Sequence, residues 1–150
     1  AMTNATVDVI GCGFYKGAGP ASAVYTHGGG THAGTGGIQT GTQKSSLPGY
    51  GSFRAPVTVG SGGYWDGAGH AELKGGGSVY FSVGQHFSAG ENVKFLADSA
   101  EAQWYSGAGG SIFIRCGKLM DVDIDEIVPY LLTTRYDRAN MGDIEMVYEC

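Results

Sequence analysis

The sequence has few charged residues, few prolines and few cysteines. Charged residues make up 15% of its 150 positions, and it holds four prolines and three cysteines. Glycine fills 28 positions, but without the proline content or the three-residue glycine period of collagen. No apolar run is long enough to span a membrane, and no charged-then-apolar leader stands at the start. These absences favour synthesis without secretory export and no membrane insertion.

The net charge of −5 gives no basic footprint for nucleic acid. This charge is unevenly placed along the chain. Residues 1–120 carry six acids and seven bases, whereas residues 121–150 carry eight acids and two bases, a net of −6. We therefore expect a glycine-rich body over residues 3–119 and an acidic, structured C-terminal extension over residues 120–150.

Three cysteines, Cys12, Cys116 and Cys150, cannot form a complete disulfide framework. We expect reduced thiols, with Cys12 and Cys116 packed in strands and Cys150 loose at the terminus. One intramolecular pair plus a terminal thiol is the alternative.

Aromatic residues are plentiful at 11%, which argues against disorder. Short runs rich in β-branched and aromatic residues alternate between faces; Val79, Phe81 and Val83, for example, share one face. No glycine-free helical window precedes residue 118. The pattern predicts an all-β body, a sandwich or barrel. The expected strands are residues 6–10, 22–26, 52–59, 71–74, 78–83, 92–97, 102–106 and 111–116.

The stretch from residue 26 to residue 48 is the largest gap between expected strands, and it is rich in glycine, threonine and serine. A loop of this length in a compact domain is usually functional or mobile. An extended segment held by a partner chain is the alternative.

The extension has its own predicted elements. Alternation over residues 120–125 indicates an edge strand, and Pro129 suits the first turn of a short helix that stops at Asn140 and Gly142. Residues 144–148 alternate again and predict a final strand. Asp121, Asp123 and Asp125 resemble the start of a calcium loop, but we interpret them as a solvated acidic edge.

One pattern occurs three times: two aromatic residues, any residue, then Gly-Ala-Gly, at residues 14–19, 64–69 and 104–109. The simpler interpretation is three hairpin turns, with glycines at positive φ and aromatics paired across strands. The alternative is threefold pseudosymmetry, as in trefoil or prism lectins, in which each aromatic pair is a platform for a sugar.

Motifs for catalysis and cofactors are sparse. The glycines after His27 lack the helix and the acidic residue of a dinucleotide site, so no cofactor is expected. His27 and His32, with Cys12 or His70, could in principle hold a metal, but we interpret them as exposed loop histidines and expect no metal. Asp66 beside an aromatic pair could act as a glycosidase acid, although such a residue more often caps a turn.

Four segments resemble a known family when taken in order. Gly-Ser-Phe-Arg-Ala-Pro at residues 51–56 is followed by Gly-Tyr-Trp at 63–65, Ala-Gly-Glu-Asn-Val-Lys-Phe at 89–95, and Ser-Ile-Phe at 111–113 running to Gly-Lys-Leu at 117–119. They resemble strands of the tumour-necrosis-factor and complement-globular-head jelly rolls. The resemblance implies a jelly-roll-like β-sandwich that assembles as a trimer, as in adhesion heads and on bacteriophage fibres and particle surfaces.

From these observations we expect an all-β, jelly-roll-like β-sandwich with a short C-terminal helix and strand. Its expected function is that of a non-enzymatic virion surface or fibre module, made in the host cytoplasm and assembled as a homo-oligomer, with a trimer expected. A lectin for a surface glycan is the alternative, and a small glycan-cleaving enzyme that uses Asp66 is the second. The candidate ligand-binding residues are Tyr64, Trp65, Asp66, Trp104 and Tyr105.

Overall fold

A computed structural model describes residues 1–22, 28–37, 47–65, 73–100, 102, 105–120 and 145–149, the last five and residues 119 and 120 by their backbone alone. The described residues form strands and no helix, so none of them lies in a helix that could cross a membrane. The strands are β1 (Thr6–Asp8), β2 (Ser78–Ser88), β3 (Lys94–Leu96), β4 (Ser111–Met120) and β5 (Glu145–Glu149).

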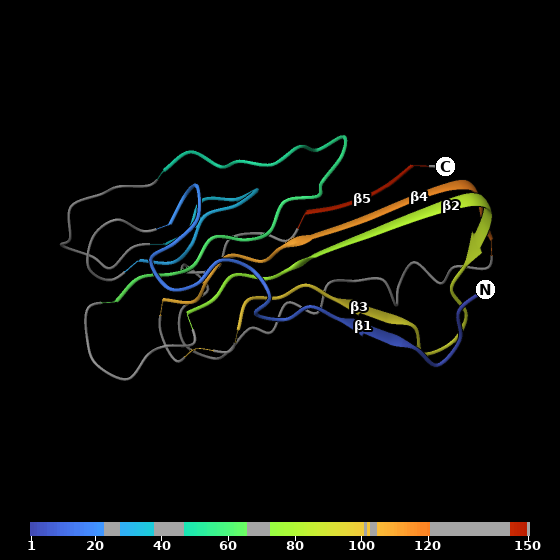
Figure 1. Ribbon diagram of the computed structural model, residues 1–150, viewed down its shortest axis with the longest axis horizontal. Coiled ribbons are helices and arrows are strands. Elements are labelled where there is room, and N and C mark those ends of the chain that lie inside the picture. The colour runs from blue at the N-terminus through green and yellow to red at the C-terminus, as the bar shows by residue number, and fades with distance from the viewer. Residues whose placement is uncertain are drawn as a thin grey trace.

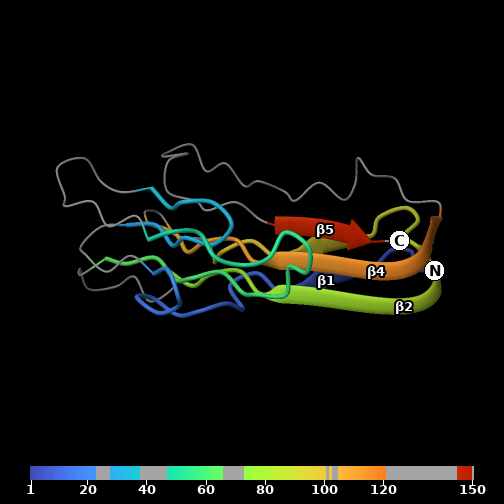
Figure 2. The same ribbon diagram turned by 90° about the horizontal axis from the view of Figure 1, so that it is seen from above.

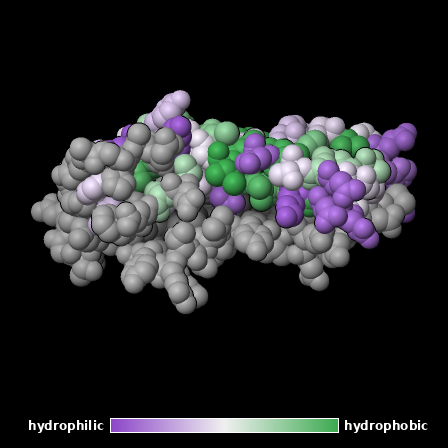
Figure 3. Space-filling view, turned by 90° about the horizontal axis from the view of Figure 1, so that it is seen from below, coloured by the Kyte–Doolittle hydropathy of each residue, from purple (hydrophilic) through white to green (hydrophobic). Residues whose placement is uncertain are grey.

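The strands form two sheets, and all three ladders are parallel. One sheet has the order β2-β4-β5, and the other pairs β1 with β3. Figures 1 and 2 show the two sheets as layers, with their strands along the long axis of the molecule. On the side of β1 and β3, the described surface is hydrophobic near the middle and hydrophilic toward the N-terminal end (Figure 3).

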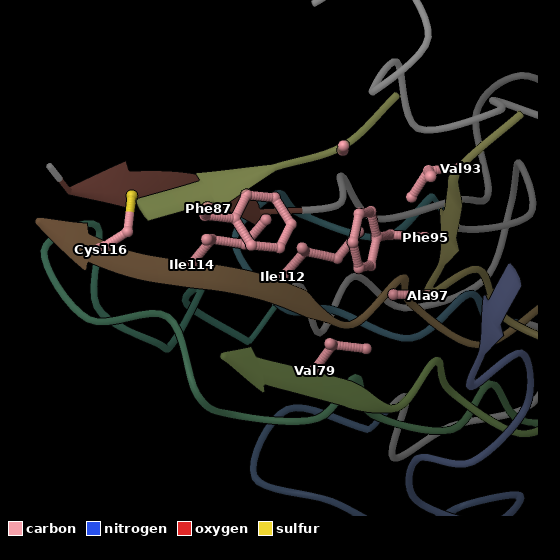
Figure 4. Close-up of a cluster of buried hydrophobic side chains, with 9 residues drawn as sticks. Val79, Phe87, Val93, Phe95, Ala97, Ile112, Ile114 and Cys116 are labelled. Atoms are coloured by element: carbon pink, nitrogen blue, oxygen red, sulfur yellow. The ribbon is translucent and has the colours of Figure 1, made fainter. Parts of the chain in front are cut away.

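An apolar cluster lies between the two layers, and both contribute to it. Val79 of β2 and Ile112 and Ile114 of β4 meet Phe95 of β3, with Val7 of β1 packed against them (Figure 4). The alternation along β2 and β4 explains the placement, because every second side chain points to the same face. The period-two prediction for residues 78–83 and 111–116 is therefore confirmed.

The rest of the described chain forms what we call the glycine bundle: residues 11–22, 28–37, 56–65, 73–77 and 105–110. Segment 60–64 lies among four others and hydrogen bonds to each. The amide of Phe14 donates to the Gly60 carbonyl (3.0 Å), and the Gly60 amide donates to Gly76 (2.9 Å). The Gly28 and Ala108 amides donate to other carbonyls of the same segment. A strand in a sheet has at most two neighbours, so this packing is not a sheet.

The hydrogen bonds of the bundle repeat every three residues. Phe14 donates to Gly60, and three residues later Gly17 donates to Gly63 (2.9 Å). Gly60 donates to Gly76, and Gly63 donates to Leu73 (2.9 Å). Three residues per turn without internal hydrogen bonds is the repeat of the extended polyproline-type helix, whose amides and carbonyls are free to bond outward in several directions.

Glycine is required in the bundle because neighbouring backbones touch. A Cβ at Gly63 would overlap the carbonyl oxygen of Tyr105, and one at Gly60 would overlap that of Ala108. One at Gly110 would overlap the carbonyl oxygen of Gly77, where the bundle continues into β2 and β4. The abundant glycine of this sequence is therefore a packing requirement, and much of the interior of the bundle is backbone.

The strand predictions have a mixed outcome. β1, β2, β3 and β4 lie within or overlap the expected segments 6–10, 78–83, 92–97 and 111–116, and β5 matches the expected final strand at 144–148. The strand expected at residues 52–59 is wrong. There the Ser52 hydroxyl accepts hydrogen bonds from the amides of Arg54 and Ala55 (3.3 and 3.2 Å), and this side-chain bonding turns the chain.

Other expected elements are partly or wholly beyond what the structure describes. In segments 22–26, 71–74 and 102–106, the described residues are not in strands. The helix expected from Pro129 and most of the strand expected at 120–125 lie outside the described residues. A jelly roll is built of antiparallel strands, whereas the ladders described here are parallel, so the jelly-roll expectation is not confirmed.

Candidate functional site

The aromatic-Gly-Ala-Gly motifs come together around segment 61–64. The amide of Gly17, from the first motif, donates to the Gly63 carbonyl, and the Gly62 amide donates back to Ala18 (both 2.9 Å). A Cβ on Gly17 would lie 2.9 Å from the Tyr64 ring, so the first motif packs on the second. Tyr105 of the third motif lies with its carbonyl against Gly63. The structure thus assembles parts of all three motifs, which are separated by 40 to 50 residues in sequence.

The structure describes three of the five predicted ligand-binding residues. Tyr64, Trp65 and Tyr105 are each half-buried at this junction. Asp66 and Trp104 lie outside the described residues. We call Tyr15, Tyr64, Trp65 and Tyr105 the aromatic cluster.

Tyr15 was missed as a candidate, although it occupies the motif position of Trp65 and Tyr105. Its side chain is 69% exposed. The Lys74 ammonium lies 5.3 Å from the centre of the Tyr15 ring, a cation–π arrangement. Its position in the motif could have identified Tyr15, because it is the second aromatic residue of its motif, as Trp65 and Tyr105 are of theirs.

The described motifs do not share one backbone conformation. In the first, Gly17 and Gly19 have φ values of 69° and 112°, and the Ala18 amide donates to Tyr15 (2.9 Å), closing a tight turn. In the third, Tyr105 itself has a φ of 58°, and Gly107 packs against the Lys74 carbonyl. The first motif therefore has the positive-φ glycines that the hairpin-turn interpretation predicts. The third motif, in its described residues, is a segment of the bundle and forms no such turn.

Besides the aromatic cluster, a group of polar side chains lies around His32, which is inside the bundle. Its Nε2 is 2.7 Å from the Thr58 hydroxyl, and its ring meets the Tyr50 ring edge-on at 4.8 Å between centroids. The Tyr50 hydroxyl donates to the Val59 carbonyl (2.6 Å) and accepts from the Ser61 hydroxyl (3.0 Å). The expectation of an exposed histidine is wrong, because His32 is 0% exposed.

Burial governs the acid–base chemistry of this cluster. Desolvation lowers the pKa of His32, and the Gly109 backbone offsets part of that effect. Burial also raises the pKa of the Tyr50 hydroxyl, which the Ser61 hydroxyl partly opposes. Both groups are therefore neutral at pH 7.

The described residues hold no group of three or more His, Cys, Asp or Glu side chains that could bind a metal. Cys12 is a free, exposed thiol outside any strand, and Cys116 of β4 is disulfide-bonded. Cys12 is therefore reduced as expected but not packed in a strand, and Cys116 is packed in a strand as expected but not reduced. Cys12 follows the turn at Gly11, which takes it out of β1 and to the surface. His27 and His70 lie outside the described residues.

The chain matches no protein-family model, no curated protein and no solved structure.

Proposed function

We propose that this chain is a non-enzymatic structural and adhesion module that assembles as a homo-oligomer, on a virion surface or fibre. The observation that carries the proposal is the glycine bundle. Its segments touch through backbone atoms, so its interior has little room for side chains. Such a framework leaves few interior positions for side chains, among them those of His32 and Leu73.

Several large apolar side chains of the described chain are exposed, and they support the oligomer. Phe53 is 74% exposed, Val57 is 52% exposed and Tyr80 is 51% exposed. Apolar groups that gather on a surface are commonly covered by a partner. In a homo-oligomer with cyclic symmetry, copies of the same side chains would cover one another.

Native mass spectrometry and light scattering test the assembly. We expect a defined oligomer, a trimer, at micromolar concentration. Phe53→Ser with Val57→Ser should shift the population toward monomer, whereas Ser82→Ala, at an exposed polar position of β2, should not. A wild-type chain that stays monomeric at micromolar concentration contradicts the oligomer proposal.

A lectin is the second candidate, and the meeting of the three motifs favours it. Aromatic rings at one junction can stack on the apolar faces of sugar rings, and Lys74 beside Tyr15 adds a hydrogen-bond donor. Asp66 and Trp104 would join the cluster in this proposal.

A glycan array identifies a ligand, and variants then locate its site. Trp65→Ala and Tyr15→Ala should each weaken binding by at least about tenfold, because stacking of one ring contributes on the order of 1.5 kcal/mol. Phe53→Ala, an exposed aromatic outside the motifs, is the matched control and should bind normally. Binding that survives both motif variants would remove the aromatic cluster from the proposal. Glycan cleavage through Asp66 stays a prediction, tested by release of reducing sugar in wild type and Asp66→Asn.

A further inference from the structure

His32 joins segments of the bundle that are far apart in sequence. Its ring bonds to Thr58 through Nε2, and its carbonyl accepts a hydrogen bond from the Tyr50 amide (2.8 Å). Thr58 also connects to the strands, because its carbonyl accepts from the Ser111 hydroxyl at the start of β4 (2.7 Å). His32 therefore lies where residues 28–37, residues 47–50, residues 56–61 and β4 are held together.

The other ring nitrogen of His32 has no partner. Nδ1 is buried and makes no hydrogen bond in the described structure. In the neutral ring, the cheapest tautomer carries its proton on Nε2, which donates to Thr58 and leaves only a lone pair unsatisfied at Nδ1. Protonation would add a second N–H and a positive charge to a buried ring, and the Gly109 backbone offsets only part of that cost.

The described segments around His32 hold no charged side chain that could neutralise that charge. Residues 28–37, 47–50, 56–61 and 105–110 contain no Asp, Glu, Lys or Arg. Their other titratable groups are Tyr50, whose ring contacts His32, and Tyr105. No charged side chain contributes to the pKa shift of His32, which comes from burial and is partly offset by the Gly109 backbone. An imidazolium here would be a buried charge with no counter-ion in these described segments.

We propose that His32 is an acid-sensitive latch, which holds residues 28–37 and Tyr50 against residues 56–61 while neutral and releases them when its ring is protonated. With Nδ1 buried and unpaired, the protonated ring is more stable when water reaches it, so protonation favours the arrangement in which the segments part. This proposal goes beyond the proposed function, and it does not depend on what the module binds.

The sign of the pH effect follows from linkage. Because the folded-state pKa of His32 is lowered, the opened or unfolded chain binds the proton more tightly than the closed one. The contribution of His32 to stability is complete above the ordinary imidazole pKa of about 6.5 and falls as the pH drops below it, until the folded-state pKa is reached.

Two measurements on the wild-type chain test the latch. Imidazole nitrogen NMR should show His32 neutral and titrating below the range of an exposed histidine. Hydrogen exchange, corrected for its intrinsic pH dependence, should show residues 28–37 and 56–61 opening more often at pH 5 than at pH 7.5. The opening constant should rise by at most about tenfold per pH unit, because one proton is taken up. An imidazole that titrates at or above the ordinary value, or an opening constant for these segments that does not change with pH, overturns the proposal.

Variants separate His32 from the other histidines. His32→Gln keeps an amide that can bond to Thr58 but cannot titrate there, so the acid-dependent opening should disappear. His86→Gln, at an exposed position of β2, is the matched control and should leave it unchanged. If His32→Gln does not fold, Thr58→Val is the second variant, because it retains the titrating ring and removes the hydrogen bond between Nε2 and the Thr58 hydroxyl. It should raise the opening constant of these segments at both pH values and keep the increase at acid pH. An acid response that persists in His32→Gln, or that is absent in Thr58→Val, contradicts the latch.

Discussion

The strand region and the glycine bundle of this chain are built by different rules. Between the sheets, side chains such as Ile112 and Phe95 fill the interior, and the backbones are kept apart by them. In the bundle, the backbone fills much of the interior, and a single Cβ at Gly63 would have no space. The first region is stabilised by buried apolar area, and the second by hydrogen bonds between closely packed backbones.

The comparison teaches what each region tolerates. A side-chain core can relax around a smaller residue and lose part of its packing energy. A backbone core cannot relax around a larger residue without moving whole segments, which are held by hydrogen bonds to their neighbours. The two regions should therefore be sensitive to opposite kinds of substitution. The strand region should lose stability when a side chain is truncated, and the bundle should lose stability when one methyl group is added.

The largest effect is expected for Gly63→Ala. The added Cβ overlaps the Tyr105 carbonyl oxygen, so we expect a loss of more than about 4 kcal/mol in the free energy of unfolding, measured by denaturant titration. Gly84→Ala is the matched control, because a Cβ at Gly84 in β2 meets nothing within 4 Å. Its expected effect is within about 0.5 kcal/mol of wild type. Equal stabilities for the two variants would refute the backbone-core description.

A smaller loss is expected for Ile112→Ala in β4. Ile112 is 1% exposed at the centre of the cluster, so truncation should cost about 2–4 kcal/mol. Ser82→Ala, at an exposed position on the neighbouring strand, should change the same denaturation midpoint little. If Ile112→Ala were as stable as Ser82→Ala, the cluster between the sheets would not be the source of stability in that region.

Asp98 follows β3, where the two regions meet. Its contribution to the free energy of unfolding should change with pH in the direction opposite to that of His32. Asp98 is 5% exposed, and burial, with a smaller contribution from Asp8, raises the pKa of its carboxyl group. The folded chain thus binds this proton more tightly than the unfolded chain, and Asp98 contributes stability as pH falls through its raised pKa toward 3.8. Its charge costs stability at neutral pH.

Asp98→Asn tests this expectation. The variant should be more stable than wild type at pH 7, by less than the Ile112→Ala effect, and the difference should shrink in acid. Thermal melts at several pH values measure it, with exposed Glu91→Gln as the control. A variant that is less stable than wild type at pH 7 would show that the carboxylate is needed in its charged form.

The strand region could be predicted from the sequence because its signal is local. Val79, Phe81 and Val83 alternate with exposed residues, and the buried face follows directly from that period. The parallel pairing could not be predicted, since it depends on which distant strands meet. Residues 52–59 were misread because a strand-like composition was overruled by hydrogen bonds that the Arg54 and Ala55 amides donate to the Ser52 hydroxyl.

The bundle could not be predicted because glycine clusters ordinarily indicate turns and loops. His32 was expected on the surface for the same reason. Its neighbours are mostly glycines without side chains, so the imidazole is the group that fills the space between the segments. The aromatic cluster could be predicted in part from the sequence. The repeated motif identified Tyr64, Trp65 and Tyr105, but it did not identify the segment around which they meet.

The smallest effect is expected where the bundle meets solvent, at Tyr15. Its side chain is 69% exposed and its contact with Lys74 is a surface cation–π pair, so Tyr15→Leu should cost less than about 1 kcal/mol. Tyr15→Phe keeps the ring and should be closer still to wild type in denaturant titrations. A cost approaching that of Gly63→Ala would mean that surface side chains hold the bundle together, and that its stability does not come from backbone contact alone.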